Sequence, residues 1–145
     1  MSDTPIYLPP NLEALVSFFL QGQDEVLDYV PTERIVTDLT GIKTWPAIRV
    51  VQFFDDAVTN RPLWLVRAQI QVEVFGSDRG KHEAFLVAAV CRAVMDARLV
   101  GVHSRGVVTD VSTFGMQDAP DQPSGRPRWL FTAQVTGHPL PQPIS

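Results

Sequence analysis

The chain has 145 residues, 45% of them hydrophobic and 19% charged, with a net charge of -4 and a pI of about 5.2. This composition is typical of one folded domain and argues against intrinsic disorder. The acidic balance leaves no excess of Lys and Arg to neutralise phosphates, so nucleic-acid binding without sequence preference is not indicated. The single cysteine, Cys91, has no internal disulfide partner, which suits a reducing compartment or a chain indifferent to redox conditions.

The first ten residues are rich in proline and predict an extended lead-in. They lack the basic start and apolar core of a signal peptide. The longest apolar run, residues 84–91, is far shorter than the roughly 20 residues that a membrane span needs. We therefore expect a soluble protein with no membrane partner.

A helix is predicted over residues 11–21, because apolar residues recur there at helical spacing. Asn11 is a suitable N-cap, and Gly22 is a suitable end. Residues 24–30 predict a further short turn, which Pro31 stops.

Three strands are predicted next, over residues 33–38, 47–54 and 63–75, with a polar turn at 55–62 that makes the last two a hairpin. The third strand has the clearest alternation, with one apolar face and one polar face. Its apolar face contains Trp64, Val66, Ala68, Ile70, Val72 and Val74. Its polar face contains Arg67, Gln69, Gln71 and Glu73.

A helix over residues 80–97 is predicted to follow, capped by Ser77 or Asp78. Its apolar face is wide and consists of two adjacent stripes. One stripe contains Leu86, Val90, Ala93 and Ala97, and the other contains Val87, Cys91 and Val94. Arg92 and Asp96 are expected on the solvent side, where they form an i,i+4 pair.

The remaining residues predict a connector at 99–104, a strand at 106–114, a long loop at 115–127 and a last strand at 129–136 closed by Gly137. The last strand alternates, with Trp129, Phe131, Ala133 and Val135 on one face, and Trp129 is expected in the core. Residues 138–145 predict an irregular proline-rich tail. The resulting order, α-β-β-β-α-β-β, predicts a single α+β domain over 1–145, with a mostly antiparallel sheet and helices packed on one face.

No catalytic constellation is evident in the sequence. The three histidines do not have metal-ligand spacing with Cys91 or with one another. His103, Ser104 and Asp110 include the residue types of a hydrolase triad, but no nucleophile elbow accompanies them. We therefore expect no enzymatic activity, no metal and no cofactor.

Three further features have ordinary structural interpretations. Asp55 and Asp56 are adjacent in a predicted turn, where a solvated pair is the expected state. Cys91 falls within an apolar helix, where a thiol is buried and inert. The turn at residues 75–80 joins a strand to a helix but lacks the spacing of a dinucleotide-binding or P-loop motif.

The element order and texture resemble the tail terminator proteins of long-tailed bacteriophages, also called tail-completion or tail-to-head joining proteins. Three segments account for this resemblance: NLEALVSFFLQ, QVEVFGSDRGKHEA and RWLFTAQVTG. The similarity extends over roughly residues 10–137.

This resemblance implies a structural virion protein, located at the head–tail interface after synthesis in the host cytoplasm. Its copies form a ring, a hexamer in this family, that caps the tail tube, ends tube polymerisation and gives the head a docking surface. The implied partners are further copies of itself, the tail tube protein and a head-completion or connector protein. DNA passes through the lumen without specific binding, and no enzymatic activity or cofactor is implied.

Two surfaces are candidates for assembly contacts in such a ring. One is the polar face of strand 63–75, with Arg67, Gln69, Gln71 and Glu73; the other is loop 115–127, with Met116, Gln117, Asp118, Asp121 and Arg126. In a monomer both would be ordinary solvated surface. Two other functions remain open at this level: a head-completion or connector protein of the same neck, and a small ligand-binding or enzymatic α+β domain.

Overall fold

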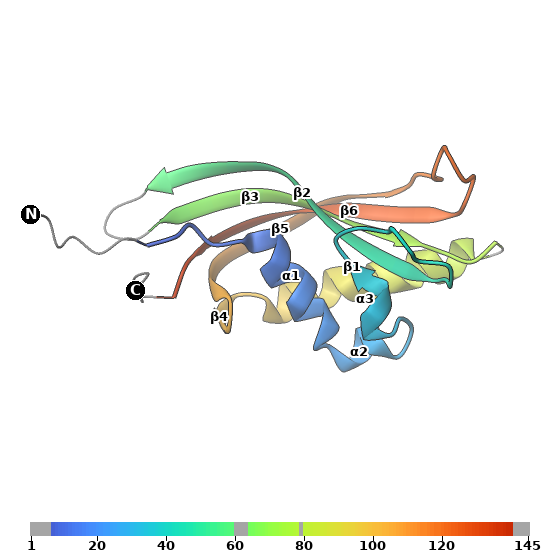
Figure 1. The fold of residues 1–145 in the computed structure, drawn as a ribbon, viewed down its shortest axis with the longest axis horizontal. Helices are drawn as coiled ribbons and strands as arrows, with labels where there is room; N and C mark the ends of the chain where they lie inside the picture. Colours follow the sequence, from blue (N-terminus) through green and yellow to red (C-terminus); the bar gives the residue numbers. More distant parts are fainter. Residues whose placement is uncertain (1–6, 60–63, 79, 141–145) are drawn as a thin grey trace, which may run out of the picture.

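The computed structural model describes residues 7–59, 64–78 and 80–140. Within these ranges the chain forms a six-stranded sheet of order β1-β2-β3-β6-β5-β4. Every neighbouring pair is antiparallel except β1 and β2. The helices lie on one face of the sheet, and the other face is open (Figure 1). The predicted α+β fold with a mostly antiparallel sheet is therefore confirmed.

Helix α1 (Leu12–Gln21) begins and ends where the sequence predicts. The Asn11 side chain accepts a hydrogen bond from the backbone N–H of Ala14 at 3.0 Å, and the backbone N–H of Gly22 bonds to Phe19. The apolar stripe of α1 is buried against the sheet. A short helix α2 (Asp24–Leu27) follows.

The strand predicted at 33–38 is much shorter in the structure. A 3-10 turn (Thr32–Arg34) precedes β1 (Ile35–Val36), which pairs with the start of β2. Beyond β1 the chain turns, because the Asp38 carboxylate accepts hydrogen bonds from both the N–H and the hydroxyl of Thr40. These bonds also lower the pKa of Asp38, and such side-chain bonds to nearby backbone compete with strand pairing.

Strand β2 (Ala47–Thr59) extends through residues that the sequence assigned to a turn. Asp55 and Asp56 lie in this strand, paired with β3 (Leu65–Phe75). Asp56 forms an ion pair with Arg67 at 3.5 Å across the two strands. The predicted turn at 55–62 was wrong for residues 55–59, and its last three residues lie outside the described residues. Composition indicates only polarity, whereas cross-strand partners decide whether a polar residue is tolerated in a strand.

Helix α3 (Lys81–Arg98) confirms the predicted second helix. The cap prediction was wrong, because Gly80 occupies the N-cap position and no side chain accepts a capping bond there. Glu83 in the first turn instead approaches the N–H and hydroxyl of Ser77 at 3.5 Å. An acidic side chain in the first turn also favours the helix dipole. Among the described residues, no helix has both the length and the apolar character required to cross a membrane.

The chain then forms β4 (Gly101–His103), β5 (Gly106–Asp118) and β6 (Arg128–His138). Strand β4 falls within the predicted connector. Strand β6 lies at the centre of the sheet, between β3 and β5. Strands therefore flank β6 on both sides, and helix α3 packs on its apolar face. Phe131 on that face is fully buried.

Trp129 lies on the same face as Phe131 but is only partly buried. Its ring packs edge-to-face on Phe85 of α3, with 4.9 Å between ring centroids. The expected core position of Trp129 is therefore corrected: Trp129 lies at the margin of the core, and Phe131 on the same face is fully buried.

Candidate assembly surfaces

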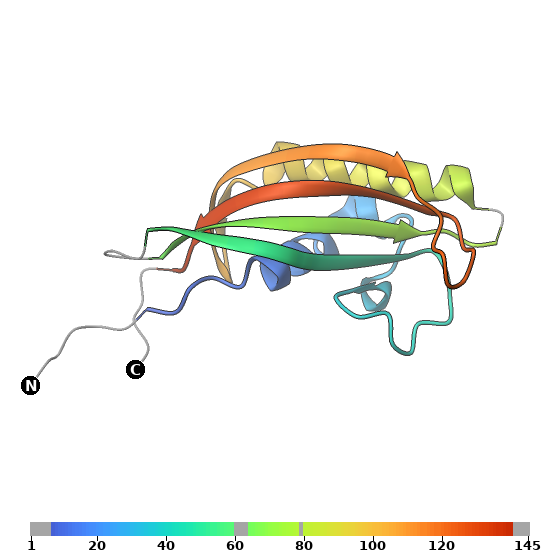
Figure 2. The ribbon, with the colours of Figure 1, turned by 90° about the horizontal axis from the view of Figure 1, so that it is seen from above.

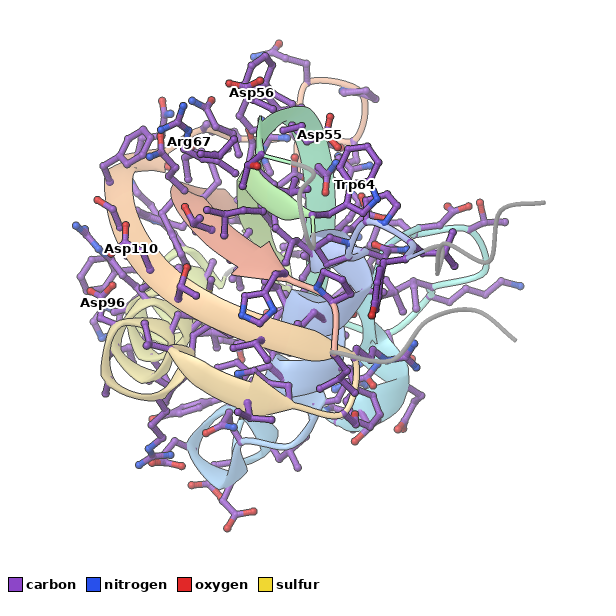
Figure 3. All side chains as sticks on the ribbon, turned by 90° about the vertical axis from the view of Figure 1, so that its left-hand side faces the viewer. Asp55, Asp56, Trp64, Arg67, Asp96 and Asp110 are labelled. Carbon is purple, nitrogen blue, oxygen red and sulfur yellow. The ribbon has the colours of Figure 1, made fainter. Side chains whose placement is uncertain are left out.

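The open face of the sheet is polar along its middle rows. On β3, Arg67, Gln69 and Gln71 project from this face, and Arg67 is 46% exposed. Across the sheet, the middle rows of β6 carry threonine and glutamine beside them: Gln69 pairs with Gln134, and Gln71 with Thr132. Figure 3 shows Asp56 beside Arg67, with Asp110 projecting from β5. This confirms the predicted alternation of β3 and leaves polar side chains on the open face of β3 and β6.

Glu73 departs from the predicted pattern because its side chain is buried, with only 4% of the residue exposed. Its carboxylate accepts a hydrogen bond from Arg49 Nε at 2.8 Å and another from Gln71 Nε2 at 2.8 Å. A second guanidinium, that of Arg128, lies 3.7 Å from the carboxylate. Both arginines also approach the Phe75 ring, at 5.7 and 5.9 Å. Glu73 therefore joins three strands within the subunit, and its solvated position in the sequence interpretation is corrected.

We expect Glu73→Gln to lower the free energy of unfolding by about 2–3 kcal/mol, because breaking a buried ion pair leaves its partner without compensation. The value lies below the full range for buried pairs because the Arg49 side chain is 33% exposed and can be hydrated. Urea unfolding followed by circular dichroism measures the change.

The matched control is Asp56→Asn, which removes an ion pair in which both side chains are about half exposed. It should cost less than about 1 kcal/mol, as solvated surface pairs do. Equal losses in the two variants would contradict a special role for the buried carboxylate.

The predicted loop 115–127 begins four residues later than expected. Met116, Gln117 and Asp118 belong to β5, after a register shift at Gly115, whose φ of 71° lies in the left-handed region that glycine tolerates. Met116 packs against the core, and Asp118 forms an ion pair with Lys81 at 2.8 Å. The sequence did not predict that β5 extends to Asp118, because a glycine such as Gly115 is compatible with a turn and also with a β-bulge inside a strand.

The remaining loop, residues 119–127, is held by its own hydrogen bonds. The Asp121 carboxylate accepts bonds from the N–H and hydroxyl of Ser124, and its backbone bonds to Arg126. The Arg126 guanidinium lies 4.1 Å from the centre of the Trp45 ring and donates to the carbonyl of Gly76. Arg126 is thus anchored to the subunit rather than extended into solvent.

Helix α3 presents an outer apolar stripe that the sequence placed in the core. Val87, Cys91 and Val94 face the sheet, whereas residues 86, 90, 93 and 97 are half-buried or exposed. Asp96 is exposed, as predicted, whereas Arg92 is half-buried, and both bond to Thr113 of β5. The buried face is therefore narrower than predicted, because two adjacent apolar stripes do not show which of them packs on the sheet.

This outer stripe borders an open groove of about 320 Å³, lined by Val90, Ala93, Ala97 and by Arg98 with its partner Glu25. Two side-chain bonds from Arg98 lower the pKa of the Glu25 carboxyl.

The residue types associated with catalysis are dispersed. His103 packs edge-to-face on Phe19 and its ring Nε2 lies 2.6 Å from the carbonyl of Leu99, whereas Asp110 projects from the open face of β5. The shallow cavity beside His103 has about 180 Å³, below the roughly 300–1,000 Å³ typical of ligand sites. In the described ranges, no cluster of three or more His, Cys, Asp or Glu has the arrangement of a metal site.

Cys91 is fully buried, and burial raises the pKa of its thiol from 9.0 to about 12. We expect the native protein at pH 8 to resist iodoacetamide, because burial hides the thiol from the reagent and its raised pKa keeps it protonated. The raised pKa should also reduce stability as the pH rises from about 9 to 12, since only the unfolded thiol then loses its proton. Mass spectrometry with and without urea measures the labelling; rapid labelling of the folded chain would contradict the burial.

Comparison with known proteins gives a fold-level match. No family model matches the sequence, and no curated protein does. A solved structure described as "Virion of native gene transfer agent (GTA) particle" contains a chain of similar fold, with a TM-score of 0.56 and 18% sequence identity. The alignment covers 88% of this chain and 94% of the other. At this identity the similarity concerns the fold alone.

Proposed function

We propose that this chain is a structural virion protein and acts as a tail terminator. Its copies form a ring that caps the tail tube, ends tube polymerisation and gives the head its docking surface. The observation that supports a virion component is the similarity of fold, over nearly the whole length of both chains, to a chain from a gene transfer agent virion. The finer role comes from the resemblance of element order to tail terminators.

In this proposal the ring is a hexamer, and its partners are the tail tube protein below and a head-completion or connector protein above. It performs no chemical step and needs no cofactor. DNA passes through the lumen without specific binding, and a net charge of -4 suits a channel that does not retain an anionic polymer. The protein is then located at the head–tail interface of the virion.

The test is control of tail length. Tail tubes are polymerised with and without the purified chain and measured by negative-stain electron microscopy. We expect a ring-shaped cap and a defined length when the chain is present, and overlong tubes without it. Val72→Asp, expected to be unfolded, serves as the inactive control.

The location of the chain in the virion distinguishes this role from a head-completion role. Immunogold labelling should place the chain in contact with the tail tube. Labelling on the head side only, together with tubes of normal length in its absence, would overturn the terminator role and favour a connector.

A further inference from the structure

The sheet has two long edges that no strand covers in the part of the chain that the structure describes. Strand β1 pairs only with Ile48 and Arg49 of β2, and β4 pairs only with residues 106–108 of β5. Residues 50–58 of β2 and 110–118 of β5 therefore have a strand on one side only. Figure 2 shows β2 and β5 as the outer two of the four long strands. Such edges are templates for pairing with another chain.

The directions of the two edges are complementary. Each of the four long strands, β2, β3, β6 and β5, is antiparallel to the next. Because their number is even, β2 and β5 run in opposite directions. When a second copy is placed beside the first in the same orientation, β5 of one copy meets β2 of the next as an antiparallel pair. This contact is heterologous, and it generates a ring when the rotation between copies closes.

We propose that β5 of one copy pairs with β2 of the next, with Phe114 opposite Phe54. This rests on the proposed function, because it names the surfaces by which the ring is built. The occupant of each edge is therefore a second copy of this chain. Three observations fix the register.

The first observation is charge. Asp56, Arg67, Thr136 and Asp110 form one row across the sheet. If a neighbour continued this row without an offset, Asp110 would lie directly opposite the neighbour's Asp56. Like charges in opposite positions destabilise a strand pair. The junction therefore requires an offset.

The second observation is the pair of exposed aromatic rings. Phe54 is 53% exposed and Phe114 is 44% exposed, and each lies on the open face of its edge strand. An offset of two residues places these rings opposite each other and places Ser112 opposite Asp56. An even offset also keeps every side chain on its original face. The two rings then form an aromatic cross-strand pair, and the contact removes both of them from water.

The third observation is length. With the same offset, residues 50–58 of one copy lie opposite residues 118–110 of the other, so the uncovered segments overlap from end to end. Strands β1 and β4 then lie beyond the paired segments and do not obstruct them. The register that separates the aspartates is thus also the one that covers both edges completely.

One backbone group on each edge already has a side-chain partner. The Glu13 carboxylate accepts the N–H of Gln52 at 2.7 Å, and Arg92 donates to the carbonyl of Thr113 at 3.1 Å. Both contacts partly satisfy the edge in a single subunit. Pairing with a neighbour requires these two side chains to share or release their backbone partners.

Disulfide cross-linking tests the proposal in the full-length chain. A double variant, Phe54→Cys with Phe114→Cys, places opposite Cβ atoms about 4.5–5.5 Å apart in the proposed register, near the spacing that a disulfide accepts. Cys91 is buried and does not interfere. Assembled protein is oxidised mildly and run on a non-reducing gel. We expect a ladder of multimers that dithiothreitol collapses to monomer.

The single variants are the matched controls. Neither Phe54→Cys nor Phe114→Cys alone can extend beyond a dimer, and in a head-to-tail ring neither should cross-link. Dimers from a single variant would show that like edges pair, which overturns the proposal. A stronger ladder from Val51→Cys with Phe114→Cys, the pair expected without an offset, would overturn the register.

Electron microscopy of the same samples separates this proposal from the proposed function. Rings without cross-links in the double variant would overturn the edge pairing and leave the ring intact. A ladder of open chains that never close would support the edge pairing and contradict the terminator. Absence of both rings and ladders would contradict both.

Discussion

Val72→Asp is expected to unfold the subunit. Val72 is fully buried at the middle of β3, between Val50 on β2 and Phe131 on β6. A carboxylate there has no partner and must either remain charged in an apolar environment or take up a proton. We expect a loss of more than about 4 kcal/mol, which is a large share of the roughly 5–15 kcal/mol that stabilises a domain. Far-UV circular dichroism and a thermal melt measure it.

The control for this change is Gln69→Asp, three residues earlier on the open face of the same strand. It should cost less than about 1 kcal/mol, because a half-buried polar position can hydrate the new charge. The alternation alone favours Gln71 as the control. The structure replaces it, because Gln71 donates to the buried Glu73 carboxylate and an aspartate there would add a like charge. A cooperative melt near the wild-type temperature for Val72→Asp would mean that the sheet faces are assigned wrongly.

Phe131→Ala should lower the free energy of unfolding by about 3–5 kcal/mol, the range for removing a large buried aromatic side chain. Phe131 is fully buried on the central strand, so the surrounding strands and helix cannot collapse into the space it leaves. Urea unfolding with an unchanged m-value would attribute the loss to stability rather than to a change in compactness.

Trp129→Ala makes a useful comparison on the same strand face. Its loss should be smaller, about 2–3 kcal/mol, because the ring is partly buried and lies at the end of the sheet. The indole N–H of Trp129 is also buried without a hydrogen-bond acceptor in the described residues, which offsets part of the benefit of burying the ring. A greater loss of unfolding free energy for Trp129→Ala than for Phe131→Ala would show that Trp129 lies nearer the centre of the core than Phe131 does.

Patterns within one segment predicted the long elements well. The alternation of β3 and the helical spacing of α1 indicate which residues face the core, and the structure agrees from Val66 to Val72. These features are local, because burial of one face requires a fixed period whatever covers it. The fold class followed from the order of such segments.

Interactions between distant segments decided the candidate surfaces. Glu73 is buried because Arg49 and Arg128 lie on the neighbouring strands, 24 and 55 positions away in the chain. No local pattern contains that information. The two open edges likewise exist only once the sheet order is known, since neither β2 nor β5 reveals in its own sequence how much of it another strand covers.

The sequence alone thus determined the periodic elements and their buried faces, because hydrophobic spacing acts within one segment. Only the tertiary structure decided which apolar stripe of α3 faces outward, where β2 and β5 end, and which polar residues are buried. The physical reason is that cross-strand ion pairs, bulges and helix rotation depend on partners brought together by folding. The proposed contact between Phe54 and Phe114 of neighbouring copies likewise depends on the tertiary structure, which places both rings on the open face at the two edges of the sheet.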